Sequence, residues 1–376
     1  MRGLSVAMVG EDIEPPWADG VVNTIKNWCE GLSQYGASVC VLSTTSQGAS
    51  FMRLNNVSYL YLGLKQKRFE GGLIDAVRFQ REIIRNVKLA DYDVVHFHGI
   101  EGLTSVPPML YMKLRRKKRI SSYHSTTLSN FTIGFKNIMF NRFTVPSTRI
   151  ISKLVKHGIP KNKIAVIHPS VDTDIFHSMN KTKARNALGL PDDSFIMLYA
   201  GHFKKGRGIL ELISKYKELV NKGAYDVKLV LAWTGQGEAE IISALSDISR
   251  KDHGIIILGP TNNMPTVYNA ADVYILPVRD EKWVIEIPLS LVEALSCGVP
   301  AISFNVGGIS ELIVNGVNGF LLKPNDFTSL KDILTGLLKD RIDVDHLSKN
   351  ARKTIVDRFS NQNVAKKLLS LYEELL

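Results

Sequence analysis

Apolar runs alternate with amphipathic stretches along the first half of the chain. Residues 4–9 form a continuous apolar run, and residues 21–35, after a glycine-containing loop, have the apolar spacing of a helix. Gly36 then stands where a left-handed glycine often ends a helix. Further strands are predicted at 39–43, 57–62, 94–97, 120–124 and 143–146, with helices such as 73–89 between them. Continuous apolar strands separated by helices are typical of a parallel sheet covered on both faces.

The same alternation begins again near residue 164. A strand at 164–168 leads into a linker region, 173–193, that contains a short helix. The later strands are predicted at 195–200, 227–232, 255–258, 273–276 and 300–303, and the later helices at 208–221, 237–250, 264–270 and 289–296. The 376 residues also exceed the roughly 250–300 at which a single hydrophobic core stops growing.

This organisation predicts an α/β fold of two Rossmann-like, doubly wound domains that face a central cleft. We assign residues 1–175 to the first domain and 176–358 to the second, and we expect a C-terminal helix, 359–376, to pack back on the first. Because ligands bind beyond the carboxyl ends of parallel strands, the cleft between two facing sheets is the expected site.

Composition and cysteine content favour a cytoplasmic globular protein. Hydrophobic residues make up 45% of the chain, yet no apolar run reaches the ~18 residues that a membrane-spanning helix needs. The first apolar run meets an acidic stretch, 11–14, and is therefore interpreted as a strand and not as a signal peptide. Cys29, Cys40 and Cys297 are too few and too scattered for a disulfide framework, which fits a reducing compartment.

The net charge of +11 is concentrated in the first half of the chain. Residues 1–175 carry 23 Lys+Arg against 13 Asp+Glu, whereas residues 176–376 carry 24 against 23. The densest cluster consists of Lys113, Arg115, Arg116, Lys117, Lys118 and Arg119. An anionic bilayer attracts such cations by roughly 1 kcal/mol each, although a solvated helix end has the same composition. No nucleic-acid recognition motif accompanies the cluster, so no nucleic acid is expected as a partner.

A second stretch, 128–143, combines apolar residues at helical spacing with aromatic rings, among them Phe131 and Phe135, and with interrupting cations. Such a stretch suits a helix that lies in a membrane interface, although a buried core helix has the same spacing. Together with the charge asymmetry, it predicts peripheral attachment to an anionic membrane surface, the inner face of the cell membrane.

Histidines and aspartates raise the question of a metal site. His96 and His98 lie on one face of a strand end because strand side chains alternate, but no acidic or third histidine ligand is near them in sequence. Asp-x-Asp triplets, which can hold a divalent metal, occur at 91/93, 172/174 and 343/345. Turn and cap chemistry explains all three, so no essential metal is predicted.

Two segments of the second half have the residues of an anion-binding site. Residues 201–208 follow a strand and open a helix, where backbone amides bind anions, and Arg207 can bind phosphate oxygens bidentately. Glu293 lies early on the predicted helix 289–296, with Pro288 near its first turn. A carboxylate in such a place can accept hydrogen bonds from both hydroxyls of a ribose.

The segment 286–326 resembles the donor-binding segment of the family 4 glycosyltransferases, which have the GT-B fold of two Rossmann-like domains. The resemblance extends over most of the chain and includes the segments AGHFKKGRG, WTGQGE, NAADVYILPV and HPSVDTDIF. It implies a retaining glycosyltransferase that moves a hexose from a UDP-sugar or GDP-sugar co-substrate to an acceptor. The acceptor attacks on the face that the leaving group departs from, the leaving phosphate accepts its proton, and no further cofactor is essential.

The resemblance assigns roles in the second domain. Glu293 matches the family glutamate that binds the ribose, and Arg207 takes a diphosphate position. His202 stands where the family has arginine, which leaves Lys204 or Lys205 as the second cation. The first family glutamate lies eight positions before the second, but Glu286 lies seven before Glu293, so Trp283 is an alternative wall of the sugar pocket. The implied donor set is Gly20, His202, Lys204, Lys205, Arg207, Gly235, Glu286, Leu289 and Glu293.

In the first domain, Gly20 lies in the loop where the family has a Gly-Gly pair that approaches the donor phosphate. His124 matches the active-site histidine of the family, and His98 and Gly99 lie on the acceptor side. The implied catalytic residues are His124, Arg207 and Glu286. The charge distribution favours a lipid-linked saccharide or glycolipid as acceptor. A nucleotide-sugar epimerase on the same fold and a non-catalytic nucleotide-sugar-binding protein are the alternatives.

Overall fold

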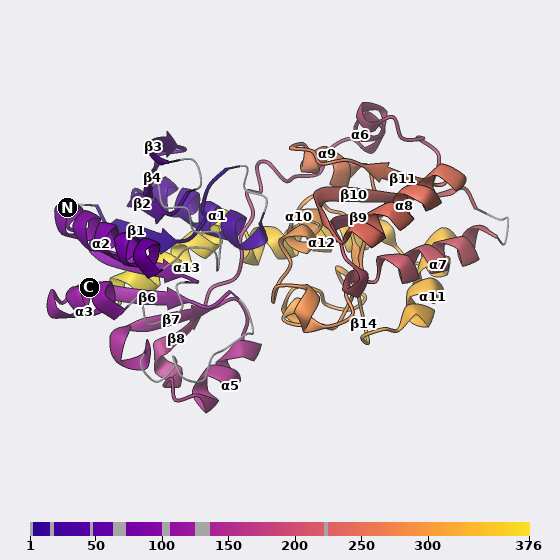
Figure 1. Ribbon diagram of the computed structural model, residues 1–376. Helices are drawn as coiled ribbons and strands as arrows, with labels where there is room; N and C mark the ends of the chain where they lie inside the picture. Colours follow the sequence, from indigo (N-terminus) through magenta and orange to yellow (C-terminus); the bar gives the residue numbers. More distant parts are fainter. Residues whose placement is uncertain are drawn as a thin grey trace. The chain divides into compact units, whose positions relative to one another are not determined.

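The computed structural model describes residues 3–15, 19–45, 48–62, 73–99, 106–124, 136–221 and 225–376. The predicted membrane contacts Phe131 and Phe135 lie outside these residues. The chain divides into two compact units: unit 1 comprises Met1–Ser170 and Asn361–Leu376, and unit 2 comprises Val171–Ser360. The chain thus passes from unit 1 into unit 2 and returns, and each unit has its own sheet (Figure 1).

Unit 1 contains an eight-stranded sheet with the order β3-β4-β2-β1-β5-β6-β7-β8. Its strands are β1 (Ser5–Gly10), β2 (Ser38–Ser43), β3 (Ala49–Leu54), β4 (Val57–Leu62), β5 (Val94–His98), β6 (Lys118–Ser122), β7 (Arg142–Val145) and β8 (Ile164–Val166). All pairs are parallel except β3 with β4. This hairpin, which the apolar pattern did not predict, turns at Asn55 and Asn56, whose φ angles of 48° and 62° asparagine tolerates well.

Helices cover both faces of this sheet. Alternate residues of β1 enter two different cores, since Val6 and Met8 belong to one and Ala7 and Val9 to the other. The first core is closed by α1 (Gly20–Gln34) and α13 (Asn361–Glu373), the second by α2 (Leu73–Ala90), α3 (Val106–Leu114) and α5 (Arg149–Lys156). The helix α13, yellow in Figure 1, lies beside α1 and brings the end of the chain into unit 1.

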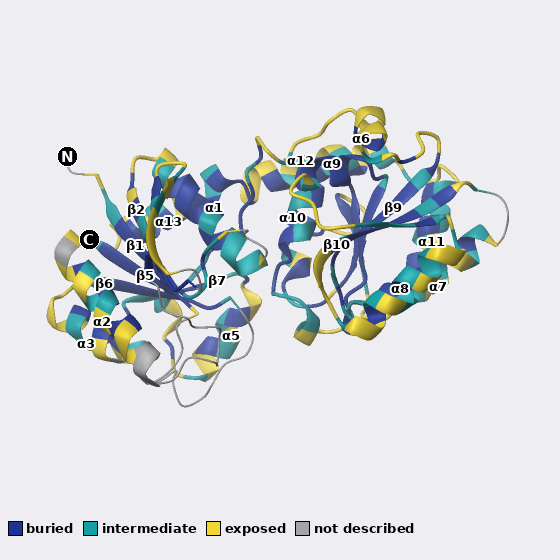
Figure 2. Cartoon of the chain, turned by 45° about the horizontal axis from the view of Figure 1, so that its top comes forward, coloured by how far each residue is buried: buried dark blue, intermediate teal, exposed yellow. Residues whose placement is uncertain are grey.

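Unit 2 contains a six-stranded, fully parallel sheet with the order β11-β10-β9-β12-β13-β14. Its strands are β9 (Phe195–Phe203), β10 (Val227–Gly237), β11 (Ile255–Leu258), β12 (Val273–Leu276), β13 (Ala301–Phe304) and β14 (Gly319–Leu322). Its helices are α6 (Lys181–Leu188), α7 (Ile209–Val220), α8 (Ala239–Lys251), α9 (Met264–Asn269), α10 (Leu289–Ser296), α11 (Phe327–Leu338) and α12 (Val344–Arg358). Figure 2 shows buried strands inside a partly exposed helical layer, which confirms the predicted α/β architecture.

The strand orders define where each sheet binds ligands. In unit 2 the chain runs from β9 outward to β11 and then returns to place β12 on the other side of β9. In unit 1 the same reversal lies between β1 and β5. Ligands of open parallel sheets bind beyond the carboxyl ends of the strands at such a switch point. The loops after β1, β5, β9 and β12 are therefore expected to carry the functional groups.

No helix in the described part of the chain combines the length and the apolar character that crossing a membrane requires. The three cysteines are free thiols, and two of them, Cys29 and Cys297, are buried.

Candidate active site

Arg207 lies beside the switch point of unit 2, in the 3₁₀ turn η3 (Lys205–Arg207) that follows β9. Its Nε is buried and has no hydrogen-bond partner among the described residues. Burial raises the pKa of Tyr199 to about 12, and the charge of Arg207 and a hydrogen bond from it oppose this rise. A guanidinium with an unused buried donor, located beyond a strand end, is suited to bind an anion there.

The turn around Arg207 uses most of its own backbone donors. Gly208 has a φ angle of +72°, and a Cβ built on it would overlap with the carbonyl oxygen of Pro277. The amide of Arg207 donates to the carbonyl of Lys204 at 3.0 Å, and the amide of Gly208 donates to that of Lys205 at 3.2 Å. The amides of Arg207 and Gly208 are therefore not available to an anion. The helix α7 begins directly after this turn, and its first backbone amides remain as donors for an anion.

The other predicted phosphate ligands of this segment have different surroundings. The strand β9 is longer than predicted and includes His202, whose Nδ1 lies 3.2 Å from Oγ1 of Thr234. Lys204 is half-buried and Lys205 is exposed. The backbone amide of Lys205 donates to Oε2 of Glu238 at 3.3 Å. Lys204 precedes the turn of Arg207 and Lys205 begins it, and their role as additional cations stays a prediction.

Glu293 lies on α10, and its carboxylate accepts a hydrogen bond from the hydroxyl of Tyr268 at 2.8 Å. No cation of the described chain pairs with it. Burial raises the pKa of Glu293 to about 7, against the effect of the Tyr268 hydrogen bond. This carboxyl group therefore changes its ionisation near neutral pH, and a ligand that donates hydrogen bonds to it would favour the ionised form.

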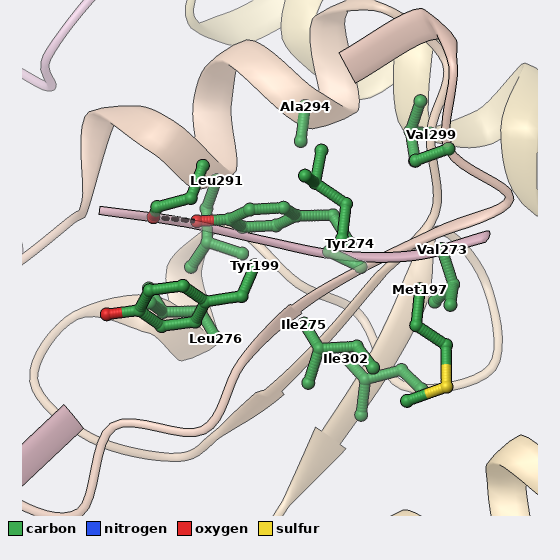
Figure 3. Packing of buried hydrophobic residues seen from close by; sticks show 14 of the residues in the cluster. Met197, Tyr199, Val273, Tyr274, Ile275, Leu276, Leu291, Ala294, Val299 and Ile302 are labelled. Carbon is green, nitrogen blue, oxygen red and sulfur yellow. Dashed lines mark hydrogen bonds between the residues drawn. The ribbon is translucent and has the colours of Figure 1, made fainter. Parts of the chain in front are cut away.

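A buried tyrosine connects the surroundings of Arg207 and Glu293. The hydroxyl of Tyr274, on β12, lies 2.9 Å from Oγ of Ser290 on α10. Burial raises the pKa of Tyr274, the Ser290 hydrogen bond lowers it, and among the nearby charges Arg207 lowers it and Glu293 raises it. Figure 3 shows the rings of Tyr199 and Tyr274 extending in the same direction from the core. The two predicted donor ligands thus act electrostatically on one tyrosine.

The remaining predicted donor residues of unit 2 lie in loops or helix starts at the carboxyl end of the same sheet. Glu286, between β12 and α10, is 3% exposed, and its carbonyl accepts from the amide of Gly308 at 2.8 Å. Leu289 is the buried first residue of α10. Gly235, with a φ angle of +86°, lies in an irregular stretch near the end of β10, with a Cβ position 3.3 Å from Pro260.

In unit 1, two predicted histidines meet near the switch point. His98 is the last residue of β5, and His124 follows β6. Nδ1 of His98 lies 3.0 Å from Nε2 of His124, and Nε2 of His98 lies 3.3 Å from the sulfur of Met8. Burial lowers the pKa of His98 well below its ordinary value, and His96 and His124 add to this effect. His98 is placed to orient the ring of His124, and its contact with an acceptor stays a prediction.

His96 lies behind this pair, as the prediction of one shared strand face requires, and the ring centroids of His96 and His98 are 4.4 Å apart. Its Nδ1 is 2.8 Å from the hydroxyl of Tyr372 on α13, and its Nε2 is 2.8 Å from Oγ of Ser122. Burial, and less strongly His124, lowers the pKa of His96 to about 3. Both ring nitrogens are thus used within the fold.

The start of α1 carries the predicted phosphate contact Gly20. Oδ1 of Asp19 caps this helix and accepts from the amides of Val21 at 2.7 Å and Val22 at 3.4 Å. A phosphate at Gly20 would use the same amides and must therefore compete with the Asp19 carboxylate. Gly99, which has a φ angle of +68°, directly follows β5 and is exposed.

The Asp-x-Asp triplets have structural partners. Asp172 accepts from the amide of Asp174 at 2.9 Å, and Asp343 caps α12, as turn and cap chemistry predicts. Asp93 instead accepts from the amide and the hydroxyl of Ser5, which is distant in sequence. Within the described ranges, no three or more His, Cys, Asp or Glu side chains form a group that could hold a metal ion.

The predicted basic cluster is only partly exposed. Lys113, Arg115 and Arg116 are exposed, and Lys117 and Lys118 are half-buried. Arg119 is buried in β6, where its Nε donates to the carbonyl of Met139 at 2.6 Å and burial lowers its pKa. Arg119 is therefore bound inside the fold, which corrects its assignment to the membrane surface.

Tyr199, Tyr268 and Tyr274 were not predicted as site residues, although all three interact with the predicted donor ligands by hydrogen bonds or through charge. A sequence signal exists for two of them. Tyr199 and Tyr274 place hydroxyl groups in the apolar runs 195–200 and 273–276, and a buried tyrosine hydroxyl needs a hydrogen-bond partner.

Comparison with known proteins identifies two family regions. Residues 18–175 match the family described as Glycosyltransferase Family 4, and residues 180–354 match Glycosyl transferases group 1. The N-acetyl-alpha-D-glucosaminyl L-malate synthase of Bacillus anthracis is 23% identical over 76% of this chain and 75% of its own. A UDP-Gal:alpha-D-GlcNAc-diphosphoundecaprenol alpha-1,3-galactosyltransferase of Escherichia coli is 29% identical over 57% of this chain and 55% of its own.

Solved structures share the fold over the whole chain. A glycosyltransferase from Rickettsia africae has a TM-score of 0.83 at 17% identity, covering 100% of this chain and 99% of its own. The Anabaena protein HepE in complex with UDP has a TM-score of 0.77 at 15% identity, covering 99% and 100%, and it is also known with UDP-glucose. The chain, whose two units resemble these proteins in fold and whose sequence matches both family regions, belongs to the family 4 glycosyltransferases and is a glycosyltransferase with the GT-B fold.

Proposed function

We propose that this glycosyltransferase moves a hexose, with retention of configuration, from a UDP-sugar to a lipid-linked saccharide or glycolipid in glycan biosynthesis. The observation that carries the proposal is the pair of groups at the switch point of unit 2. Arg207 offers a buried donor without a partner in the described chain, and Glu293 offers a carboxylate without a paired cation there. The Arg207 guanidinium is suited to bind a diphosphate, and the Glu293 carboxylate is suited to accept from vicinal ribose hydroxyls.

The choice of uridine rests on the solved relatives. HepE, which shares the fold, is known in complexes with UDP and with UDP-glucose. We extend this donor class to the present chain and keep GDP-sugars as the alternative. The nucleotide-sugar epimerase is disfavoured because the matched families and relatives are glycosyltransferases.

In the proposed reaction, the bond between the anomeric carbon and the diphosphate oxygen breaks, and the acceptor oxygen bonds to the same face of the sugar. The acceptor proton passes to the leaving phosphate. Negative charge grows on this phosphate as the bond breaks, so the Arg207 guanidinium stabilises the transition state more than the ground state. His124, oriented by His98, is proposed to hold the donor sugar or the acceptor hydroxyl.

The proposed acceptor follows from the charge of unit 1. The exposed cations Lys113, Arg115 and Arg116 lie at the end of α3, next to Leu114, which is 76% exposed. Cations beside an exposed apolar side chain suit an anionic bilayer. The Escherichia coli relative acts, by its name, on a diphosphoundecaprenol-linked sugar. Both observations favour a lipid-linked acceptor at a membrane surface.

Nucleotide-sugars are expected to stabilise the purified protein. At a hundred times its Kd, a UDP-sugar should stabilise the fold by about 2.7 kcal/mol and raise Tm by roughly 5–10 °C. A thermal-shift screen of UDP-sugars and GDP-sugars measures this, with UMP as a control that lacks the diphosphate. A shift with GDP-sugars alone would correct the base, and the absence of a shift with every nucleotide-sugar would refute the donor proposal.

Removing exposed cations of unit 1 is expected to weaken membrane binding. Replacement of Lys113, Arg115 and Arg116 by serine should reduce sedimentation with vesicles of anionic lipid about tenfold or more. The matched control replaces three exposed cations of unit 2, namely Lys339, Arg341 and Lys349. Equal binding of both variants would contradict the membrane proposal and leave the donor proposal intact.

A further inference from the structure

We propose that Trp283 is a positioning residue that holds the turn of Arg207 in place for the donor diphosphate. The inference rests on the proposed function, in which Arg207 binds that diphosphate. It differs from the role of a sugar-pocket wall, because the ring contacts the backbone of the phosphate-binding turn. Arg207 and Trp283 belong to two segments on opposite sides of the switch point: Arg207 lies after β9 and Trp283 after β12.

The contact between these segments is a ring packed on a glycine. Gly206, the buried middle residue of η3, directly precedes Arg207. A Cβ built on Gly206 would overlap with Nε1, Cε2 and Cδ1 of the Trp283 indole. Trp283 ends the 3₁₀ turn η4 (Glu281–Trp283) and packs against the core of unit 2. The close packing leaves no space for a side chain at residue 206.

A second contact fixes the same glycine through its carbonyl group. The amide of Arg279 donates to the carbonyl oxygen of Gly206 at 3.1 Å. The side chain of Arg279 is itself held by Glu211 at 2.7 Å and by Asn325 at 2.8 Å. The loop after β12 therefore holds Gly206 on two sides, by a main-chain hydrogen bond and by the indole ring.

The position of the turn matters because the Arg207 head group has few other constraints besides a hydrogen bond to Tyr199. Its Nε has no hydrogen-bond partner in the described chain, and its Nη1 lies against Gly201. A shift of Gly206 therefore moves the guanidinium directly. Glu286 lies three residues beyond Trp283 in the same loop, so the indole also links the proposed phosphate ligand to the segment of the proposed sugar ligand.

Gly206→Ala is expected to lower kcat/KM for transfer from a UDP-sugar by about thirtyfold, because the added methyl group displaces the turn. Trp283→Ala removes the obstacle and loosens the turn, so about a threefold loss is expected. The double variant should match Trp283→Ala and thus recover about tenfold over Gly206→Ala. If Trp283 only stabilises the fold, kcat/KM per folded molecule should instead stay at the wild-type value in all three variants, and only their Tm should change.

Gly336→Ala in α11 is the matched control, because its methyl group meets only the flexible end of Ile342, 3.1 Å away. It should transfer sugar at the wild-type rate. If Gly206→Ala does not fold, Trp283→Phe against Trp283→Ala gives the same test, since the smaller ring should retain most of the activity. Wild-type kcat/KM in Gly206→Ala, or no rescue in the double variant, would overturn the proposal. If Arg207→Ala also transfers normally, the proposed function fails, and not the positioning role alone.

Discussion

Replacing Arg207 with alanine is expected to lower kcat/KM for sugar transfer by about 10²–10³-fold, the usual effect of removing one charge-stabilising donor. The guanidinium lies beyond β9 at the switch point of unit 2, and its buried Nε has no partner in the described chain that an incoming phosphate must displace. Steady-state transfer from a UDP-sugar to a saturating acceptor measures the loss. Because a buried donor without a partner destabilises a fold, Tm of the variant should be unchanged or higher.

Two further variants, one at Arg207 and one at its neighbour Lys205, separate the effect of charge from the effect of geometry. Arg207→Lys keeps the charge but loses the planar fork, so it should recover only part of the lost rate. Lys205→Ala removes an exposed neighbouring cation and should change kcat/KM less than about threefold. If Arg207→Ala instead binds and transfers the donor like the wild-type protein, the diphosphate is bound elsewhere and the site assignment is wrong.

The apolar pattern predicted the parallel strands well because most of them are buried on both faces. The strands 57–62, 255–258 and 273–276 have the predicted bounds. The hairpin strand β3 was missed because four of its six residues, among them Phe51 and Arg53, are exposed at the sheet edge. The strands β9 and β10 extend past their predicted apolar runs, where Gly201 pairs with Trp233 and Phe203 with Gly237. Edge strands and polar strand ends are held by backbone hydrogen bonds, which a hydrophobic pattern does not report.

The candidate site was predictable from the sequence only where the order of strands and loops along the chain determines where a residue lies in the fold. Loops that follow parallel strands lie at one edge of a sheet, which is why the loop of Arg207 could be predicted as part of a site. The pairing of His98 with His124 depends on the neighbouring positions of β5 and β6, and the burial of Arg119 depends on the residues that cover β6. In a run of six cations, no local signal distinguishes the one that points inward.

Glu293 is expected to make donor binding depend on pH near neutrality. Burial raises its pKa from the ordinary 4.5 to about 7 in the free protein, and the proposed ribose hydrogen bonds require the ionised form. Donor affinity should therefore fall as pH drops through 7, with Kd about tenfold higher at pH 6 than at pH 8. A UDP-sugar is the suitable probe, because its diphosphate carries no proton that titrates in this range. Calorimetry at several pH values measures the change.

Glu293→Gln should weaken donor binding by about a hundredfold at pH 8, because charge-assisted hydrogen bonds to the ribose contribute roughly 1.5–3 kcal/mol each. It should also remove the pH dependence. Rising pH has the opposite effect on the stability of the free protein. Because folding raises the pKa of the Glu293 carboxyl, this group destabilises the fold progressively between pH 4.5 and 7 and by a constant amount above pH 7. The glutamine variant should therefore gain in Tm relative to the wild-type protein as pH rises through this window. If Glu293→Gln still binds the donor tightly and its Kd still rises below pH 7, another group titrates and the ribose contact lies elsewhere.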